Sequence, residues 1–166
     1  IEYLVPTRGL LGYRTEFIND TRGEGTMVRR FDSFGEYKGD IPQRINGVAI
    51  AQEEGVATPY ALFNIGERVQ MFIAPGTRVY EGMIVGECAK NEDIVCNICK
   101  NKHLTNTRAS GSDDALRLVP HTVMSLEQCM EFLSDDELLE VTPRSLRLRK
   151  KILSKEQRMK QQFRNK

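Results

Sequence analysis

Apolar residues near the start of the chain recur at helical spacing. Between residues 7 and 19 four of them share one face, with Pro6 before the segment and Gly23 after it: Leu10, Leu11, Phe17 and Ile18. This pattern predicts an amphipathic helix over residues 7–19. We expect a strand over residues 1–5 to lead into the helix and a strand over residues 26–34 to leave it.

From residue 46 onward the pattern changes to short apolar runs separated by glycines. The runs cover residues 47–51, 57–63, 69–73, 83–88 and 94–98. Turn signals at Pro75-Gly76 and Glu81-Gly82 separate some of them, which indicates a compact antiparallel sheet or a small barrel. The shift in composition near residues 39–42 predicts a boundary that divides the chain into residues 1–40 and 41–166.

Two capping-box patterns follow a polar stretch. Residues 100–114 have no periodic apolar face, which predicts an exposed loop. Ser125 and Gln128 form a capping box before apolar residues at helical spacing, so we expect a short helix there. Ser134 and Glu137 repeat the pattern and predict a turn of acidic helix.

The last part of the chain is basic. Residues 145–149 alternate apolar and basic side chains, which predicts a half-buried strand with its arginines on the solvent face. Residues 154–166 are interpreted either as a polar helix or as a disordered segment. Together these elements predict an α+β fold whose larger part is a mostly antiparallel β domain with short C-terminal helices.

The composition is that of an ordinary globular protein. The chain has 166 residues, of which 40% are hydrophobic and 28% charged, enough for one domain or two small ones. No apolar run approaches the roughly 20 residues of a membrane span, so we expect no membrane association. The chain opens at Ile1 with no basic region before an apolar stretch, so we expect no secretory signal and expect a piece of a longer protein.

The net charge of +1 hides a strong asymmetry. Residues 144–166 carry ten Lys and Arg against the single Glu156, a local charge of +9, and the rest of the chain carries −8. A basic block of this kind is typical of a protein with a polyanionic partner, most often a nucleic acid. The alternative interpretation is a solvated basic segment.

Enzyme chemistry and metal binding find little support in the sequence. It contains no phosphate-binding G-x-x-x-x-G-K-[ST] motif. Cys96, Cys99 and His103 could supply three corners of a zinc site, but strand alternation separates the two thiols. A Cys99/His103 nucleophile pair lacks an orienting group and an oxyanion donor. We therefore expect the four cysteines to be free thiols in a reducing compartment, and we expect the acidic residues at 135–137 to favour a helix N-terminus.

The loop at residues 100–114 has the chemistry of an RNA contact. Cationic side chains attract phosphates, and amide and hydroxyl groups can meet a 2′-hydroxyl or a base edge. It contains no aromatic residue, which argues against base stacking within it. A solvated loop is the alternative. The candidate RNA-binding residues in this loop are Lys100, Lys102, His103, Thr105, Asn106, Arg108 and Ser110.

Four motifs in order carry a family resemblance. The segments are 5–14 (VPTRGLLGYR), 79–87 (VYEGMIVGE), 104–108 (LTNTR) and 135–143 (DDELLEVTP). They resemble the C-terminal portion of the BipA/TypA translational GTPases over nearly the whole chain, weakening after about Leu153. The sequence departs from the family pattern at Cys99, Asn101, His103 and His121.

The resemblance implies a domain organisation and a function. Residues 1–40 are similar to the C-terminal half of the ferredoxin-like domain V of elongation factor G, and residues 41–166 to the family-specific C-terminal domain. The parent protein is implied to be a cytoplasmic, ribosome-associated GTPase linked to ribosome assembly and stress adaptation. Its P-loop domain, which holds GTP and Mg²⁺, lies upstream, so we expect this chain to be non-catalytic and to need no cofactor or small-molecule substrate.

The resemblance also implies partners and contact residues. The family's C-terminal domain docks in the ribosomal A-site region, and its long loop reaches toward the acceptor end of the tRNA. By motif, that role falls in this sequence to Lys100, Lys102, Thr105, Asn106 and Arg108. The basic strand supplies a second expected RNA surface, made of Arg147, Arg149, Lys150 and Lys151. The partners are then ribosomal RNA and A-site tRNA. A zinc-binding module and a protein-interaction module that uses the acidic helix region are the alternatives.

Overall fold

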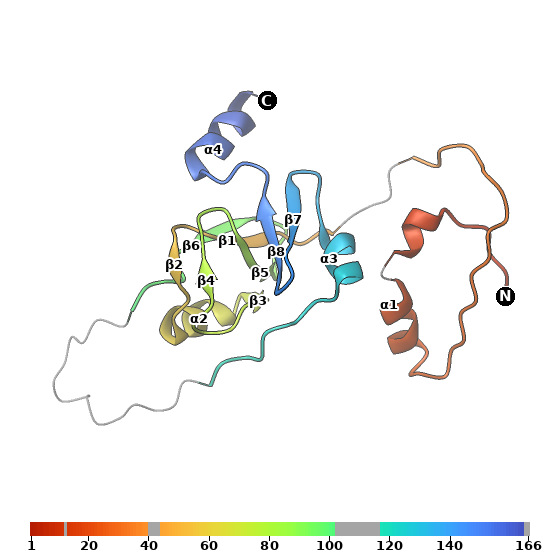
Figure 1. Cartoon of the computed structure of the whole chain (residues 1–166), viewed down its shortest axis with the longest axis horizontal. Coiled ribbons are helices and arrows are strands. Elements are labelled where there is room, and N and C mark those ends of the chain that lie inside the picture. Colours follow the sequence, from red (N-terminus) through yellow and green to blue (C-terminus); the bar gives the residue numbers. More distant parts are fainter. Residues whose placement is uncertain (12, 40–43, 102–116, 165–166) are drawn as a thin grey trace.

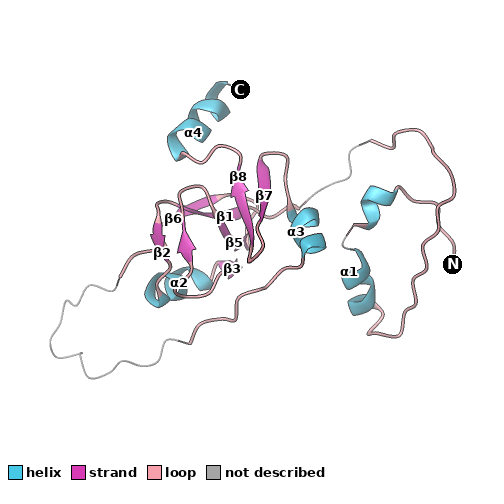
Figure 2. Cartoon of the chain, in the orientation of Figure 1, coloured by secondary structure: helices cyan, strands magenta, loops and turns pink. Residues whose placement is uncertain are grey.

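The computed structural model describes residues 1–11, 13–39, 44–101 and 117–164 and has an α+β fold, as the sequence predicts. In this described part, strands occupy the middle of the chain together with two helices, and other helices precede and follow them (Figures 1 and 2). No helix among these residues is long and apolar enough to cross a bilayer. The elements are η1 (Thr7–Leu10, a 3₁₀ helix), α1 (Tyr13–Asp20), β1 (Val48–Ala51), β2 (Gly55–Val56), α2 (Pro59–Gly66), β3 (Val69–Met71), β4 (Arg78–Val79), β5 (Ile84–Cys88), β6 (Ile94–Cys96), α3 (Leu126–Phe132), β7 (Glu137–Val141), β8 (Leu146–Lys150) and α4 (Lys155–Arg164).

β1 is an inner strand of a four-stranded sheet with the order β3-β5-β1-β6. It pairs antiparallel with β5 and parallel with β6, and β5 pairs antiparallel with β3. The expectation of an antiparallel sheet is therefore correct for β3, β5 and β1 and wrong for β6. Residues 89–93 carry the chain past the start of β1, where Lys90 C=O accepts from Gly47 N–H at 2.8 Å and Asp93 Oδ1 accepts from Val48 N–H at 2.8 Å. β6 therefore starts beside the start of β1 and runs in the same direction.

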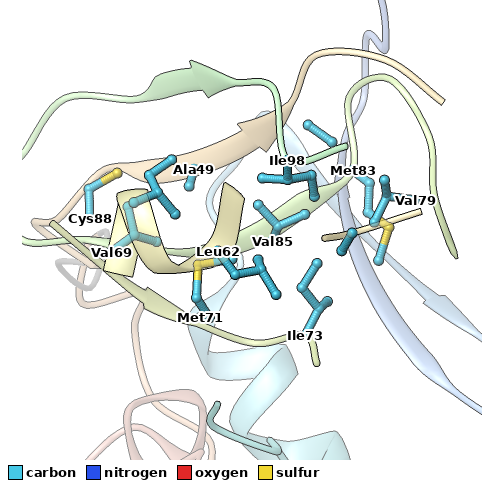
Figure 3. Close-up of a cluster of buried hydrophobic side chains, with 13 residues drawn as sticks. Ala49, Leu62, Val69, Met71, Ile73, Val79, Met83, Val85, Cys88 and Ile98 are labelled. Atoms are coloured by element: carbon cyan, nitrogen blue, oxygen red, sulfur yellow. The ribbon is translucent and has the colours of Figure 1, made fainter. Parts of the chain in front are cut away.

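Both faces of the sheet are covered, because β1 sends alternate side chains into two cores. Ala49 and Ala51 lie in the first core, to which α2 contributes Leu62 and Ile65 (Figure 3). Val48 and Ile50 lie in the second core, which contains residues of α3 and of the β7–β8 hairpin. All four β1 residues are buried, which fits a continuous apolar run better than an alternating one.

The run at residues 57–63 is a helix start, not part of the sheet. Thr58 has extended φ and ψ of −99° and 147°, its hydroxyl accepts from Ala61 N–H, and Pro59 occupies the first turn of α2. A threonine cap followed by proline is a strong helix N-terminus, because the hydroxyl satisfies a free N–H and proline fixes φ. Thr58 and Pro59 therefore indicate a helix start in the sequence, whereas the pattern of apolar residues alone does not.

The two capping-box patterns have different outcomes. Ser125 and Gln128 form the full reciprocal box at the start of α3, as predicted. At Ser134 only half is present: Ser134 N–H donates to Glu137 Oε2 at 3.1 Å. The predicted acidic helix is wrong, because residue 137 begins strand β7, which pairs with β8 along five residue pairs.

The N-terminal segment forms less regular structure than the sequence predicts. The predicted helix is split into η1 and α1, and Leu11 between them has an extended ψ of 126°. Residues 1–5 and 26–34 form no strand. A strand needs a hydrogen-bonded neighbour, and none of the described residues supplies one to either segment. Large apolar side chains there are accordingly exposed, including Val28, Phe31 and Phe34.

The basic end of the chain is regular. The predicted strand at residues 145–149 is confirmed as β8, which forms one isolated bridge to the main sheet through Arg149 and Met83. The segment interpreted either as helix or as disorder contains the helix α4.

Gly76 and Gly82 have nearly the same positive φ, 83° and 84°, but different surroundings. A Cβ added to Gly76 would meet nothing within 4 Å, whereas one on Gly82 would lie 2.6 Å from Leu153 Cα. We expect Gly76→Ala to lower the free energy of unfolding by about 1 kcal/mol through backbone strain alone, and Gly82→Ala by about 3 kcal/mol because overpacking is added. Urea unfolding of both variants measures the difference, and equal losses would contradict the proposed close approach.

Candidate nucleic-acid interface

Lys100, the first residue of the predicted RNA loop, is exposed and held at its backbone by α2. Thr58 Oγ1 donates to Lys100 C=O at 2.6 Å, and Thr58 N–H donates to Ile98 C=O at 3.0 Å. The residue that caps α2 therefore also fixes the start of the loop. The other predicted contact residues of the loop lie outside the described residues: Lys102, His103, Thr105, Asn106, Arg108 and Ser110.

The chain that follows the loop is fastened to the same helix-strand unit. Gln70 Nε2 donates to Pro120 C=O at 3.1 Å and to Thr122 Oγ1 at 3.0 Å, and Thr122 N–H donates to Met71 C=O at 2.8 Å. Leu118 packs against the first core, which contains Leu62 of α2. Both ends of the loop region thus rest on α2 and β3, and exposed cations lie at each end, Lys100 and Arg117.

The four basic residues expected on the second surface have three different environments. Arg147 is half-buried, and its guanidinium has no ion-pair partner among the described residues. Arg149 Nε pairs with Glu140 Oε1 at 2.9 Å, and Glu140 Oε2 accepts from Tyr80 Oη at 2.8 Å. Lys151 is exposed. Arg147 and Lys151 are therefore the cations of this set that are available to a phosphate.

Lys150 is buried, which corrects its expected place on the RNA surface. It lies on the inner face of β8 with Leu148, its side chain is 3% exposed, and its Nζ lies 2.7, 2.8 and 3.0 Å from carboxylate oxygens of Asp93, Asp136 and Glu137. Burial lowers the pKa of Lys150, but the three carboxylates outweigh this effect and raise it overall. The Lys150 ammonium therefore forms ion pairs within the protein and is not available to a phosphate.

Glu137 is the centre of this buried charge network, which sequence analysis did not find. Its side chain is 0% exposed, and Arg44 binds it through two bonds, Nη2 to Oε1 at 2.8 Å and Nη1 to Oε2 at 3.1 Å. The guanidinium of Arg44 also donates to Phe132 C=O at 2.9 Å and lies 4.2 Å above the Phe132 ring. Burial alone raises the pKa of Glu137, and its bonds to Arg44, Ser134 N–H and Lys150 lower it overall.

Two of the acidic residues at 135–137 therefore belong to the buried network, and none of the three begins a helix. Asp136 and Glu137 both bind Lys150. No local pattern indicated this use, because the partners lie 13 to 93 positions away. The acidic surface assumed by the protein-interaction alternative is reduced accordingly.

The cysteines are free thiols in the structure, in agreement with the prediction. Burial raises the pKa of all four, that of Cys96 to about 12. Cys96 Sγ contacts Ile50 C=O at 3.6 Å, and the described residues contain no group of three His, Cys, Asp or Glu side chains arranged for a metal ion. His103 of the zinc hypothesis lies outside the described residues. Raised pKa values make the thiols poor nucleophiles.

The comparisons with known proteins agree on one family. The model of the TypA/BipA C-terminal domain matches residues 46–155, and that of the elongation factor G C-terminus matches residues 1–45. The large ribosomal subunit assembly factor BipA of Synechocystis sp. PCC 6803 is 49% identical over 90% of this chain and 25% of its own length. The proteins of that name from Buchnera aphidicola and Salmonella typhimurium are 45% and 44% identical over 96% and 95% of the chain and 26% of their own lengths. The chain thus spans about a quarter of the length of these curated relatives.

Loss of the Glu137 charge should destabilise the fold. We expect Glu137→Gln to lower the free energy of unfolding by about 3 kcal/mol, because Arg44 loses its carboxylate partner in a buried site. Glu140→Gln is the matched control, since its carboxylate is 35% exposed, and we expect it to cost less than about 1 kcal/mol. Urea unfolding measures both, and a Glu137→Gln effect as small as that of the control would contradict the central role of this carboxylate.

The same carboxylate should determine acid stability. Because the pKa of Glu137 is lowered in the folded state, its contribution is complete above the unfolded pKa, ordinarily near 4.5, and is lost as pH falls through the lower folded pKa. The unaltered chain should therefore lose more stability between neutral and acidic pH than Glu137→Gln. Thermal unfolding across that range tests this, and parallel curves for the two proteins would refute it.

Proposed function

The chain belongs to the TypA/BipA family, and from this premise we propose that it is the non-catalytic, ribosome-binding portion of a GTP-dependent ribosome assembly factor. Its matched relatives bear the name large ribosomal subunit assembly factor. In this proposal residues 1–40 are the C-terminal half of a ferredoxin-like domain V module, and residues 41–166 are the family-specific C-terminal domain. The whole factor acts in the cytoplasm and answers stress.

The observation that carries the proposal is the anchoring of the candidate RNA loop. Thr58 holds its first residue through Lys100 C=O, and Gln70 holds the chain after it through Pro120 C=O. A loop whose two ends rest on one packed unit can present its cations at a defined place, which favours RNA recognition over a solvated loop. In the proposal, Lys100, Lys102, Thr105, Asn106 and Arg108 contact ribosomal RNA and the acceptor end of A-site tRNA.

The available cations of β8 and of the residue after it form the second part of the proposed RNA surface. Arg147 and Lys151 remain in it, Arg149 shares its charge with Glu140, and Lys150 is excluded because three carboxylates hold it. The sequence has no P-loop motif, so in this proposal GTP and Mg²⁺ are not assigned to this chain. Hydrolysis would belong to another part of the whole factor, where the nucleotide would supply the switch between ribosome-bound and free states.

The test is ribosome binding by a loop variant. We expect Lys102→Ala combined with Arg108→Ala to weaken cosedimentation of the 166-residue chain with ribosomes, and we expect binding by the unaltered chain to fall steeply with salt, because phosphate contacts release counterions. Arg22→Ala combined with Arg30→Ala, which removes two cations from the N-terminal segment, is the control for net charge. If the loop variant and the control variant cosediment with ribosomes equally well at near-physiological salt, the assignment of RNA binding to the loop is wrong.

A further inference from the structure

α4 has a surface that neither the family match nor the proposed loop contact uses. It spans Lys155–Arg164, and only its first residue lies within the segment matched by the TypA/BipA C-terminal domain. Figure 1 shows it as the last element of the chain, following β8.

One side of α4 is fastened to the domain at its first turn. Lys155 N–H donates to Glu81 Oε1 at 3.0 Å. The Arg158 guanidinium donates to Ile152 C=O at 2.8 Å and also to Leu153 C=O. Leu153 in turn lies so close to Gly82 that a Cβ there would clash with its backbone. The direction of α4 is therefore set by the body of the domain.

The other side of α4 combines an aromatic ring with cations. Phe163 is 75% exposed and Met159, one turn earlier, is 48% exposed. Lys155 lies one further turn back on the same face, and Lys160, three residues before Phe163, lies beside the ring. Arg164 lies on the flank of this face, one turn after Lys160. All three cations are exposed and have no ion-pair partner among the described residues. Glu156, seven residues before Phe163, also lies on this face and is the one acidic residue of α4. Against the three cations it leaves the face a net charge of +2.

We propose that this face of α4 binds RNA, with Phe163 stacked on an unpaired base and Lys160 and Arg164 on the adjacent phosphates. The inference rests on the proposed function, because it assumes an RNA partner. Charge complementarity favours a polyanion, and an exposed ring beside cations is the arrangement that holds unpaired bases. The predicted loop has no aromatic residue, so α4 would supply the stacking contact that the loop lacks. Two apolar residues are too narrow a face for a membrane-surface helix.

The test uses the 166-residue chain and two labelled RNAs, a hairpin with an unpaired loop and a blunt duplex, in fluorescence anisotropy titrations. We expect Phe163→Ala to weaken hairpin binding about tenfold and Phe163→Tyr to retain it, because a ring contact is lost only in the first. Duplex binding should change little in either. Lys160→Gln combined with Arg164→Gln should reduce the slope of log affinity against log salt by about one to two.

Two control variants separate this contact from net charge. Arg68→Gln combined with Lys90→Gln removes two exposed cations near the other end of β5, and Gln161→Ala changes the opposite side of α4. Hairpin affinities of the Phe163→Ala and Lys160/Arg164 variants equal to those of these controls would overturn the α4 inference. If the Lys102/Arg108 variant still loses ribosome binding in that case, the proposed function stands. If the unaltered chain binds neither ribosomes nor RNA at low salt, both fail.

Discussion

The carboxylate of Glu137 is the constraint on which the second half of the fold depends. A fully buried carboxylate is stable only if cations and N–H groups surround it. Here one N–H comes from nearby, at Ser134 before β7, and the two cations come from farther along the chain, Arg44 before the sheet and Lys150 on β8. Meeting this requirement fixes the β7–β8 hairpin against the end of α3, since Arg44 also binds Phe132. Lys150 in turn binds Asp93, whose other oxygen holds β1.

The sequence was informative where the signal was local. The box at Ser125, the strands around Ile50, Ile84 and Leu148, and the turns at Gly76 and Gly82 follow from neighbouring residues and were predicted. The errors concern long-range partners. Lys150 lies in a run of basic residues, so its position in the sequence indicates a surface lysine. Glu137 lies three residues after Ser134, the spacing of a capping box. No neighbouring residue shows that Glu137 and Lys150 are paired across a hairpin. Residues 26–34 have strand composition, but a strand also needs a neighbour.

The candidate site shows why a count of basic residues overstates a binding surface. Within the basic block, Lys150 is surrounded by carboxylates and Arg149 forms an ion pair with Glu140. The Arg158 guanidinium donates to backbone carbonyls. Among the described residues of the block, Arg144, Arg147, Lys151 and the outer cations of α4 remain available. The sequence alone indicates the basic block, but it does not show which of its residues are paired within the protein and which are exposed. That depends on which face of β8 and of α4 packs against the core. The anchoring of the loop by Thr58 and Gln70 was likewise invisible in the pattern.

The position of Arg44 bears on where the smallest independently folding piece of the protein begins. The match to the elongation factor G C-terminus ends at residue 45 and the match to the TypA/BipA C-terminal domain starts at 46, so a fragment cut by homology would open just after this arginine. Such a fragment would contain every described strand, but the buried carboxylate of Glu137 would lose the guanidinium of Arg44 that binds it. Evolutionary and physical boundaries differ here by two residues, and expression of the C-terminal domain should start before Arg44.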